Sequence, residues 1–287
     1  MAKLTKNNRS QSQIMTILKT ILSIIRNKRE PSFNSIIRRA SEEGYEIIGV
    51  AQAFDKIRNG TLGDKALILR HDVDHVSPAT KEMAEVENYY GASSTFYFRW
   101  STFDLSLIRY FNELGHECSL HYETLADYYK KHGINPKKVK PLRTILEECQ
   151  SLLRKEIDRF KECCHKDGVN IDLHSIAAHG DRVNRILGVP NNRLVEQAPK
   201  GMFSDLDEAY DETLLNKLDI YISDSPTWKC AGFKYGVNPL EAIDQGKNRI
   251  LFLTHPEHWG YTFYQKVYQI GRLCLRGVQK EPAVFKK

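Results

Sequence analysis

The chain has 287 residues, of which 41% are hydrophobic and 27% charged, and its formal net charge is +6. This length suits one large α/β domain, and the apolar content excludes a disordered chain because it is sufficient for a sizeable core. Much of the positive excess lies near the two ends of the chain, which argues against nucleic-acid binding. We therefore expect a soluble globular protein with no nucleic-acid partner.

The cysteine pattern and the N-terminal stretch both indicate a cytoplasmic protein. The six cysteines lack the paired spacing of zinc ribbons or redox dithiols, and a protein of this size does not need disulfides to fold. The apolar stretch 14–25 does not match a secretion signal, because Lys19 interrupts it and no small-residue cleavage site follows. A reducing compartment fits these features best.

The N-terminal region is predicted to be helical. Apolar residues in the stretch 14–25 recur at helical spacing, and the stretch is too short to cross a bilayer. We interpret it as a helix packed on the main body; the alternative is peripheral contact with a membrane surface through an in-plane helix. A second helical pattern covers 33–40 and ends at Gly44. Residues 1–40 are assigned to this extension and 41–287 to the main domain.

From residue 46 onward, short β-rich runs alternate with helical segments, which is typical of parallel βα repetition. Several runs are almost wholly apolar, as expected for strands covered on both faces. A long amphipathic helix predicted over 141–164 interrupts this rhythm, and we interpret it as an insertion in a barrel. The predicted strands are 46–50, 66–70, 94–98, 117–121, 170–176, 219–223 and 249–254.

Polar residues gather at the C-terminal ends of these strands, where a barrel places its active site. Taken alone, an Asp-x-Asp pair after a strand is commonly a turn or cap, but histidines and carboxylates at successive strand ends can share one cation. His174 falls inside a predicted strand and is expected to be a core residue, while His116, His132 and His165 are expected to be solvated. The converging residues are Asp72, Asp74, His121, His179, Asp224 and His255.

Residues 66 to about 124, and again 250–259, resemble the polysaccharide deacetylase (NodB homology) superfamily, in the branch whose first motif reads His-Asp-Val-Asp. The resemblance implies an α/β fold, a distorted (β/α) barrel of about seven strands. It also implies a metal-dependent hydrolase that removes N-linked or O-linked acyl groups from carbohydrates. It covers most of the chain after residue 40, but it does not explain the first thirty residues or the long helix.

The motifs of the superfamily can be carried over residue by residue. Its first motif has two adjacent aspartates, a general base and then a metal ligand, and here they correspond to Asp72 and Asp74, separated by Val73. Its second motif has two histidines four residues apart; His121 matches the first, but Leu125 occupies the place of the second. We expect the histidine at 179 to supply the missing ligand from the next strand end.

The closing motif of the superfamily, an apolar strand that ends in histidine, matches His255, which the resemblance makes the general acid. Asp224 is expected to orient His255 or to bind substrate. Trp228 and Trp259 are expected to stack on a sugar ring or to pack in the core.

Two histidines and one carboxylate with an open position favour one divalent ion, with zinc the default and cobalt, nickel or iron also suited.

The expected substrate is an acylated amino sugar or a glycan intermediate in surface-glycan biosynthesis, with acetyl and formyl groups both left open. Two alternatives remain at this point. The first is a catalytically silent carbohydrate-binding barrel, which the replacement of the second histidine by Leu125 suggests. The second is an amidohydrolase that acts on a C–N bond outside sugars. Nothing in the sequence fixes an oligomeric state.

Overall fold

A computed structural model describes residues 31–224 without 142 and 191, residues 237–260, Phe233, and a few isolated positions near the two ends. The stretch 14–25 lies largely outside the described residues. Its two interpretations, a helix packed on the main body and an in-plane helix at a membrane surface, therefore stay predictions. Within the described part of the chain, no helix is long and apolar enough to cross a membrane. The described cysteines are free thiols: Cys118, Cys149, Cys163 and Cys164.

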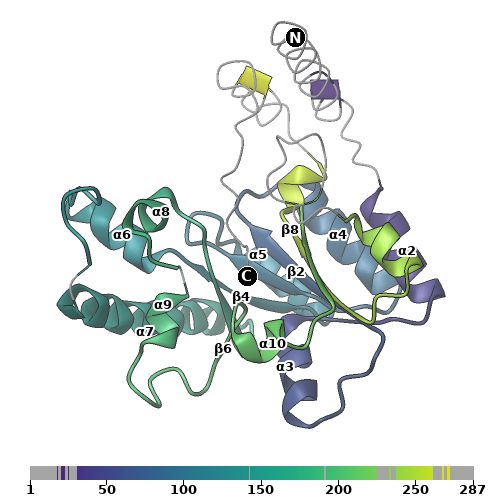
Figure 1. Ribbon diagram of the computed structural model, residues 1–287, viewed down its shortest axis with the longest axis horizontal. Coiled ribbons are helices and arrows are strands. Elements are labelled where there is room, and N and C mark those ends of the chain that lie inside the picture. The colour runs from purple at the N-terminus through teal and green to yellow at the C-terminus, as the bar shows by residue number, and fades with distance from the viewer. Residues whose placement is uncertain are drawn as a thin grey trace, which may run out of the picture.

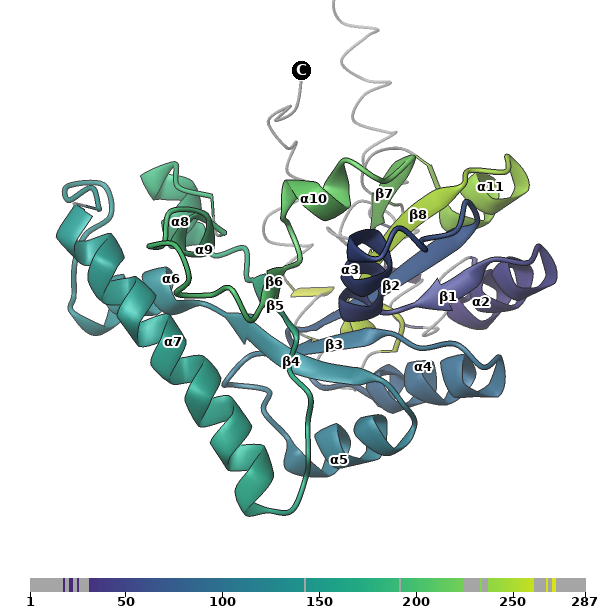
Figure 2. The same cartoon turned by 90° about the horizontal axis from the view of Figure 1, so that it is seen from below.

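The strands form one parallel sheet in the order β6-β5-β4-β3-β2-β8-β7, with β1 paired beside the first half of β2. Figure 2 shows this sheet curling around α3, so that it forms a half-barrel, as expected for the predicted distorted (β/α) barrel. The strands are β1 Glu46–Ile48, β2 Ala66–Val73, β3 Thr95–Phe98, β4 Glu117–Tyr122, β5 Ser175–Ala178, β6 Asp207–Glu208, β7 Ile220–Ser223 and β8 Arg249–Thr254.

Helices cover the outside of the sheet, with α6 to α9 grouped on one side in Figure 1 and α2 and α4 on the other. The predicted helix 33–40 is found as α2, and Gly44 ends it with a positive φ of 74°. The helices are α2 Phe33–Glu42, α3 Val50–Arg58, α4 Pro78–Tyr89, α5 Leu105–Glu113, α6 Thr124–Lys131, α7 Arg143–Lys166, α8 Arg182–Leu187, α9 Arg193–Glu196, α10 Glu212–Leu215, α11 Pro239–Asp244 and the 3-10 helix η1 Pro256–His258.

The long helix predicted over 141–164 is found as α7, and it packs on the sheet along its length. Its buried stripe includes Leu153, Ile157 and Phe160, which join the same apolar cluster as Leu120 of β4. The helix therefore covers the sheet between β4 and β5, in the place of a crossover helix.

The N-terminal ends of the strands are closed by α3. The backbone N–H of Val50 donates to the hydroxyl of Thr95 at 2.8 Å, and that hydroxyl donates to Glu117 at 2.7 Å. The turn into α3 requires Gly49, because a Cβ there would lie 2.8 Å from the Thr95 hydroxyl oxygen. Phe54 of α3 then fills the interior of the half-barrel. The closed end leaves the opposite rim for a site.

Two sequence-based expectations about histidines are wrong. His174 lies outside β5, and its half-exposed side chain pairs with Asp172 at 2.8 Å. The alternating pattern there arises because Val169 and Leu173 pack inward on the α7 cluster without forming a strand. His116, expected to be solvated, is 2% exposed, because the turn before β4 lies beneath α4.

Candidate metal and catalytic site

The predicted polar residues lie together at the C-terminal rim of the sheet. Each comes from the end of a different strand, except for the pair on β2, so residues far apart in sequence meet there. The convergence follows from the parallel sheet, in which all C-terminal strand ends share one rim. The residues are Asp72 and Asp74 at the end of β2, His121 in β4, His179 after β5, Asp224 after β7 and His255 after β8.

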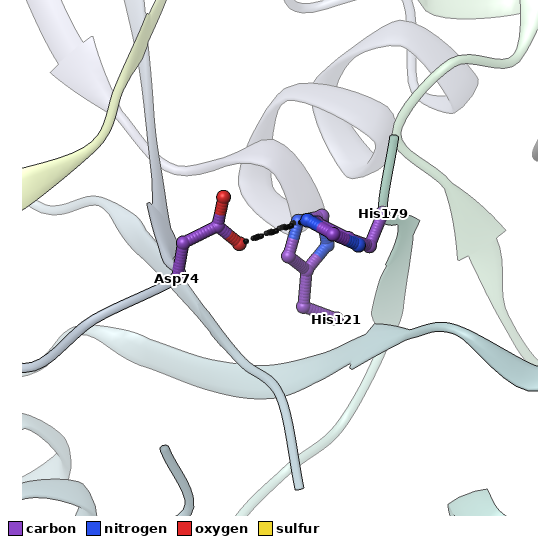
Figure 3. Close-up of side chains that lie close together, drawn as sticks. All are labelled: Asp74, His121 and His179. Atoms are coloured by element: carbon purple, nitrogen blue, oxygen red, sulfur yellow. Dashed lines mark ion pairs between the residues drawn. The ribbon is translucent and has the colours of Figure 1, made fainter. Parts of the chain in front are cut away.

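Asp74, His121 and His179 converge with ligand atoms spaced as in a metal site (Figure 3). Oδ1 of Asp74 lies 3.4 Å from Nε2 of His179 and 3.7 Å from Nε2 of His121. In a tetrahedral zinc site with bonds of 2.0–2.1 Å, the ligand atoms are roughly 3.3 Å apart. The three side chains therefore need only small shifts to bind one ion.

Three buried atoms of this group make no hydrogen bond of good geometry among the described residues: Oδ1 of Asp74, Nε2 of His121 and Nδ1 of His179, although the last lies in ion-pair contact with Glu123. Nδ1 of His121 lies 3.0 Å from the carbonyl oxygen of Ala177, and the N–H must be on Nδ1 to donate there. Burial lowers the pKa of His121 to about 4, so the ring is neutral and its Nε2 lone pair is free. A buried lone pair facing a carboxylate oxygen is costly unless a cation lies between them, so these residues fit a divalent ion.

Burial would lower the pKa of His179. The two carboxylates beside the ring, those of Asp74 and Glu123, outweigh burial and raise the pKa to about 9. Nδ1 of His179 lies 3.0 Å from Oε1 of Glu123. Without an ion, this ring is therefore protonated at neutral pH and bridges the two carboxylates. A metal must displace that proton in order to bind.

Asp72 lies beside the candidate ligands and is held by Arg70. Nε and one terminal nitrogen of Arg70 donate to the two oxygens of Asp72 at 2.7 and 2.9 Å, and both side chains are buried. Burial would raise the pKa of Asp72, but the Arg70 charge outweighs it and lowers the pKa, so the carboxylate stays ionised. Its Oδ2 lies 3.3 Å from Nε2 of His121, next to the candidate ion position.

His255 faces the same rim and is oriented by Asp224. Nδ1 of His255 lies 2.7 Å from Oδ1 of Asp224, and Nε2 points toward Asp74 with 4.0 Å to its Oδ2. Burial would lower the pKa of His255, but Asp224 outweighs it and raises the pKa to about 10. Asp224 is fully buried and also accepts from the indole N–H of Trp259. The contact with His255 is the geometry that the expected orienting role requires, whereas the expected role in substrate binding stays a prediction.

The two tryptophans considered for sugar stacking have different outcomes. Trp259 is 9% exposed and packs edge-on against Phe33 and Phe252, so it is a core residue. Trp228 lies outside the described residues. Leu125, in the place of the second histidine of the resembling motif, is 2% exposed in the core, because the chain has already turned into α6 at Thr124.

Sequence reasoning missed three charged residues of the site. Arg70 lies two positions before Asp72 on the same strand, so strand periodicity alone places both side chains on one face. Glu123 contacts His179, as described above. Glu257 follows His255 by two residues and is 4% exposed, and its Oε2 has no hydrogen-bond partner among the described residues. A carboxylate inside a His-Pro-Glu-His run was the available signal for Glu257.

Comparison with known proteins gives a likeness of fold. No family model matches the sequence, and a search of curated proteins finds no match. Among solved structures, the chain is similar to a family 4 carbohydrate esterase from Streptomyces lividans in complex with acetate, with 15% identity and a TM-score of 0.35. The likeness covers 72% of this chain and 84% of that one.

Proposed function

We propose that this protein is a metal-dependent hydrolase that removes an N-acyl group, acetyl or formyl, from an amino sugar. The observation that carries the proposal is the meeting, at one rim, of three candidate ligands with an Arg-held carboxylate and an Asp-held histidine. The sugar substrate is supported by the motifs that resemble the polysaccharide deacetylases. An intracellular step in surface-glycan biosynthesis is the context we favour.

Asp74, His121 and His179 would hold the ion, which when bound polarises a carbonyl oxygen and acidifies water. Zinc is the first candidate, since two imidazoles and one carboxylate with an open position suit it. The neutral His121 is prepared for this role, because its other nitrogen already donates to a backbone carbonyl.

Asp72 and His255 divide the proton transfers of the reaction. Asp72, ionised and fixed by Arg70, accepts a proton from the water that attacks the acyl carbon. His255, whose raised pKa keeps it protonated, then donates a proton to the amine nitrogen as the C–N bond breaks. The products are a carboxylic acid and a free amino sugar, and the cycle balances when Asp72 releases the proton it took and His255 regains one, with solvent water as the carrier.

The test compares two asparagine variants of the full chain by metal analysis and by hydrolysis of a panel of N-acetyl and N-formyl amino sugars. Asp74→Asn should lose zinc, since a ligand must contact the cation. Asp72→Asn should keep zinc yet lose most of the rate, because an amide can hydrogen-bond the water but cannot take its proton. Loss of metal from Asp72→Asn with retention by Asp74→Asn would reverse the two roles.

The same panel decides between the proposal and its alternatives. Hydrolysis of non-sugar amides with no turnover of amino sugars would favour an amidohydrolase. A wild-type protein that binds glycans but contains no metal would favour a silent carbohydrate-binding barrel, and would remove the hydrolase from consideration.

A further inference from the structure

Two side chains outside the ligand set form a chain that ends on His179. Arg99, at the end of β3, donates through Nε and a terminal nitrogen to the two oxygens of Glu123 at 2.7 and 2.8 Å. Oε1 of Glu123 then lies 3.0 Å from Nδ1 of His179. The side chains of Arg99 and Glu123 are 19% and 10% exposed, so this chain is mostly shielded from water.

The contact on Nδ1 decides what the other ring nitrogen can do. A carboxylate beside Nδ1 favours the tautomer with its N–H on that atom, which leaves the Nε2 lone pair for a cation. Nε2 of His179 is the atom that lies 3.4 Å from Oδ1 of Asp74. Glu123 therefore sits on the far side of the ring from the candidate ion position.

The two candidate histidine ligands differ in what holds them. Nδ1 of His121 lies 3.0 Å from the backbone carbonyl of Ala177, so the strand β5 supports that ring whatever side chain position 177 carries. His179 follows the end of β5, and its Nδ1 support is a side chain that is itself held by a second side chain. His179 is thus the ligand whose geometry a substitution outside the ligand set can change.

We infer that Glu123, clamped by Arg99, is a positioning residue that fixes the His179 ring with Nε2 toward a divalent cation. This inference rests on the proposed function and extends it. The ligand absent at Leu125 is then replaced by two residues, an imidazole from the end of β5 and a carboxylate from the end of β4 that orients it. Tetrahedral sites commonly depend on such partners, whose loss weakens metal affinity about 10- to 100-fold.

The experiment measures zinc affinity of the metal-free full chain by competition with a chromophoric chelator, so that no substrate is needed. Glu123→Leu should weaken zinc binding about 10- to 100-fold, and Glu123→Gln by less, since an amide oxygen in the same place can accept a hydrogen bond from Nδ1. The matched control is Glu156→Gln. The Glu156 carboxylate accepts a hydrogen bond at 2.7 Å from Thr124, the residue next to Glu123, and no contact joins it to His179 among the described residues. The Glu156→Gln variant should therefore bind zinc like wild type.

A purely structural role would give a different result. If Glu123 only packed α6, its variants would lower the melting temperature of the metal-free protein, and the loss of zinc affinity would follow from that loss of stability. The visible spectrum of the cobalt-loaded protein would not change. Positioning predicts a weakened zinc affinity with an altered cobalt spectrum. If Glu123→Leu does not fold, Arg99→Gln releases Glu123 without removing it and should also weaken zinc.

The outcomes separate this inference from the proposed function. Wild-type affinity in both the Glu123→Leu and the Arg99→Gln variants would overturn the inference and leave the metal site standing. Equal weakening in Glu156→Gln would also overturn it, because the effect would then come from α6 packing. A wild-type chain that binds no zinc would overturn the proposed function, and this inference with it.

Discussion

At the scale of single residues, the site gives the two groups proposed to transfer protons partners of opposite charge. Asp72 is paired with the cation Arg70, which keeps it ionised, and His255 is paired with the anion Asp224, which keeps it protonated. Burial makes both pairings strong, since little water screens them. An ionised carboxylate, Asp72, and a protonated imidazole, His255, can thus coexist at neutral pH on one rim.

The His255 pairing leads to a prediction about pH. Because Asp224 raises the pKa of His255 to about 10, the acid stays protonated below that pH, and kcat should fall only as pH rises through about 10. Asp224→Asn removes the anion, so the alkaline fall should move to lower pH while zinc content is unchanged. His255→Ala should reduce turnover about 100-fold or more. An unchanged alkaline limb in Asp224→Asn would show that His255 is not the group that titrates.

Glu257 leads to a second prediction at this scale. Its carboxyl group is buried with one unpaired oxygen, and burial raises its pKa well above the ordinary range. An unsatisfied buried polar group costs about 1–3 kcal/mol, so Glu257→Met should increase the free energy of unfolding, measured by urea denaturation. The rate of hydrolysis should decrease in the same variant if that oxygen contacts the substrate. A variant that loses both stability and activity would mean that Glu257 supports the fold.

The convergence of the candidate ligands at one rim could be predicted from the sequence, but the contacts that surround His179 could not. Asp74, His121 and His179 stand at strand ends, and strand ends can be recognised from apolar runs of the right length. Arg99 and Glu123 also follow strands, but only the register between β3 and β4 brings them together. Pairing of this kind depends on the tertiary fold, which hydrophobic periodicity does not describe.

At the scale of elements, α4 is attached to the sheet by a buried polar network. Oε1 of Glu87 in α4 lies 2.6 Å from Nε2 of His71 in β2, and Oε2 accepts from Ser94 at 2.6 Å. His116, before β4, lies 3.5 Å from the same Oε2. One carboxylate thus fixes a helix against three parts of the sheet.

The network predicts a loss of stability in acid. Burial would raise the pKa of Glu87, but His71 outweighs it and lowers the pKa below its unfolded value near 4.3. The stabilisation is therefore complete above about pH 4.3 and is lost as pH falls through the folded pKa. Glu87→Gln should cost about 3 kcal/mol or more at pH 7 in urea unfolding, since it breaks a buried pair. The difference from wild type should shrink as the pH falls below about 4; a constant difference would contradict the assignment.

The elements most visible in the sequence were long or strongly apolar. Predicted strands 66–70, 117–121 and 249–254 correspond to β2, β4 and β8, which are central and buried. β6 has only two residues, too few for any periodicity, and it was missed. Burial of an apolar face, rather than strand pairing, produced the misleading pattern at 170–174.

At the scale of the whole molecule, the sheet is an open half-barrel whose edge strands in the described chain are β6 and β7. α3 closes one end, with Arg58 making two hydrogen bonds at 2.7 and 2.8 Å to Asp207 of β6. At the other end, the candidate ligands come from β2, β4 and β5, so an ion there would link β2 to the paired strands β4 and β5, which the sheet joins to β2 only through β3.

Metal binding should therefore stabilise the entire fold. A ligand that binds only the native state adds about 2.7 kcal/mol at a free concentration 100 times its dissociation constant. For a chain of this size, that corresponds to roughly 5–10 °C in melting temperature, measured by calorimetry with and without free zinc. Binding must displace the proton that His179 holds with a pKa of about 9, so the gain should grow from pH 6 to pH 8. Asp74→Asn, which lacks one ligand, is the control and should show little shift. An equal rise in melting temperature for this variant would place the stabilising zinc elsewhere in the protein.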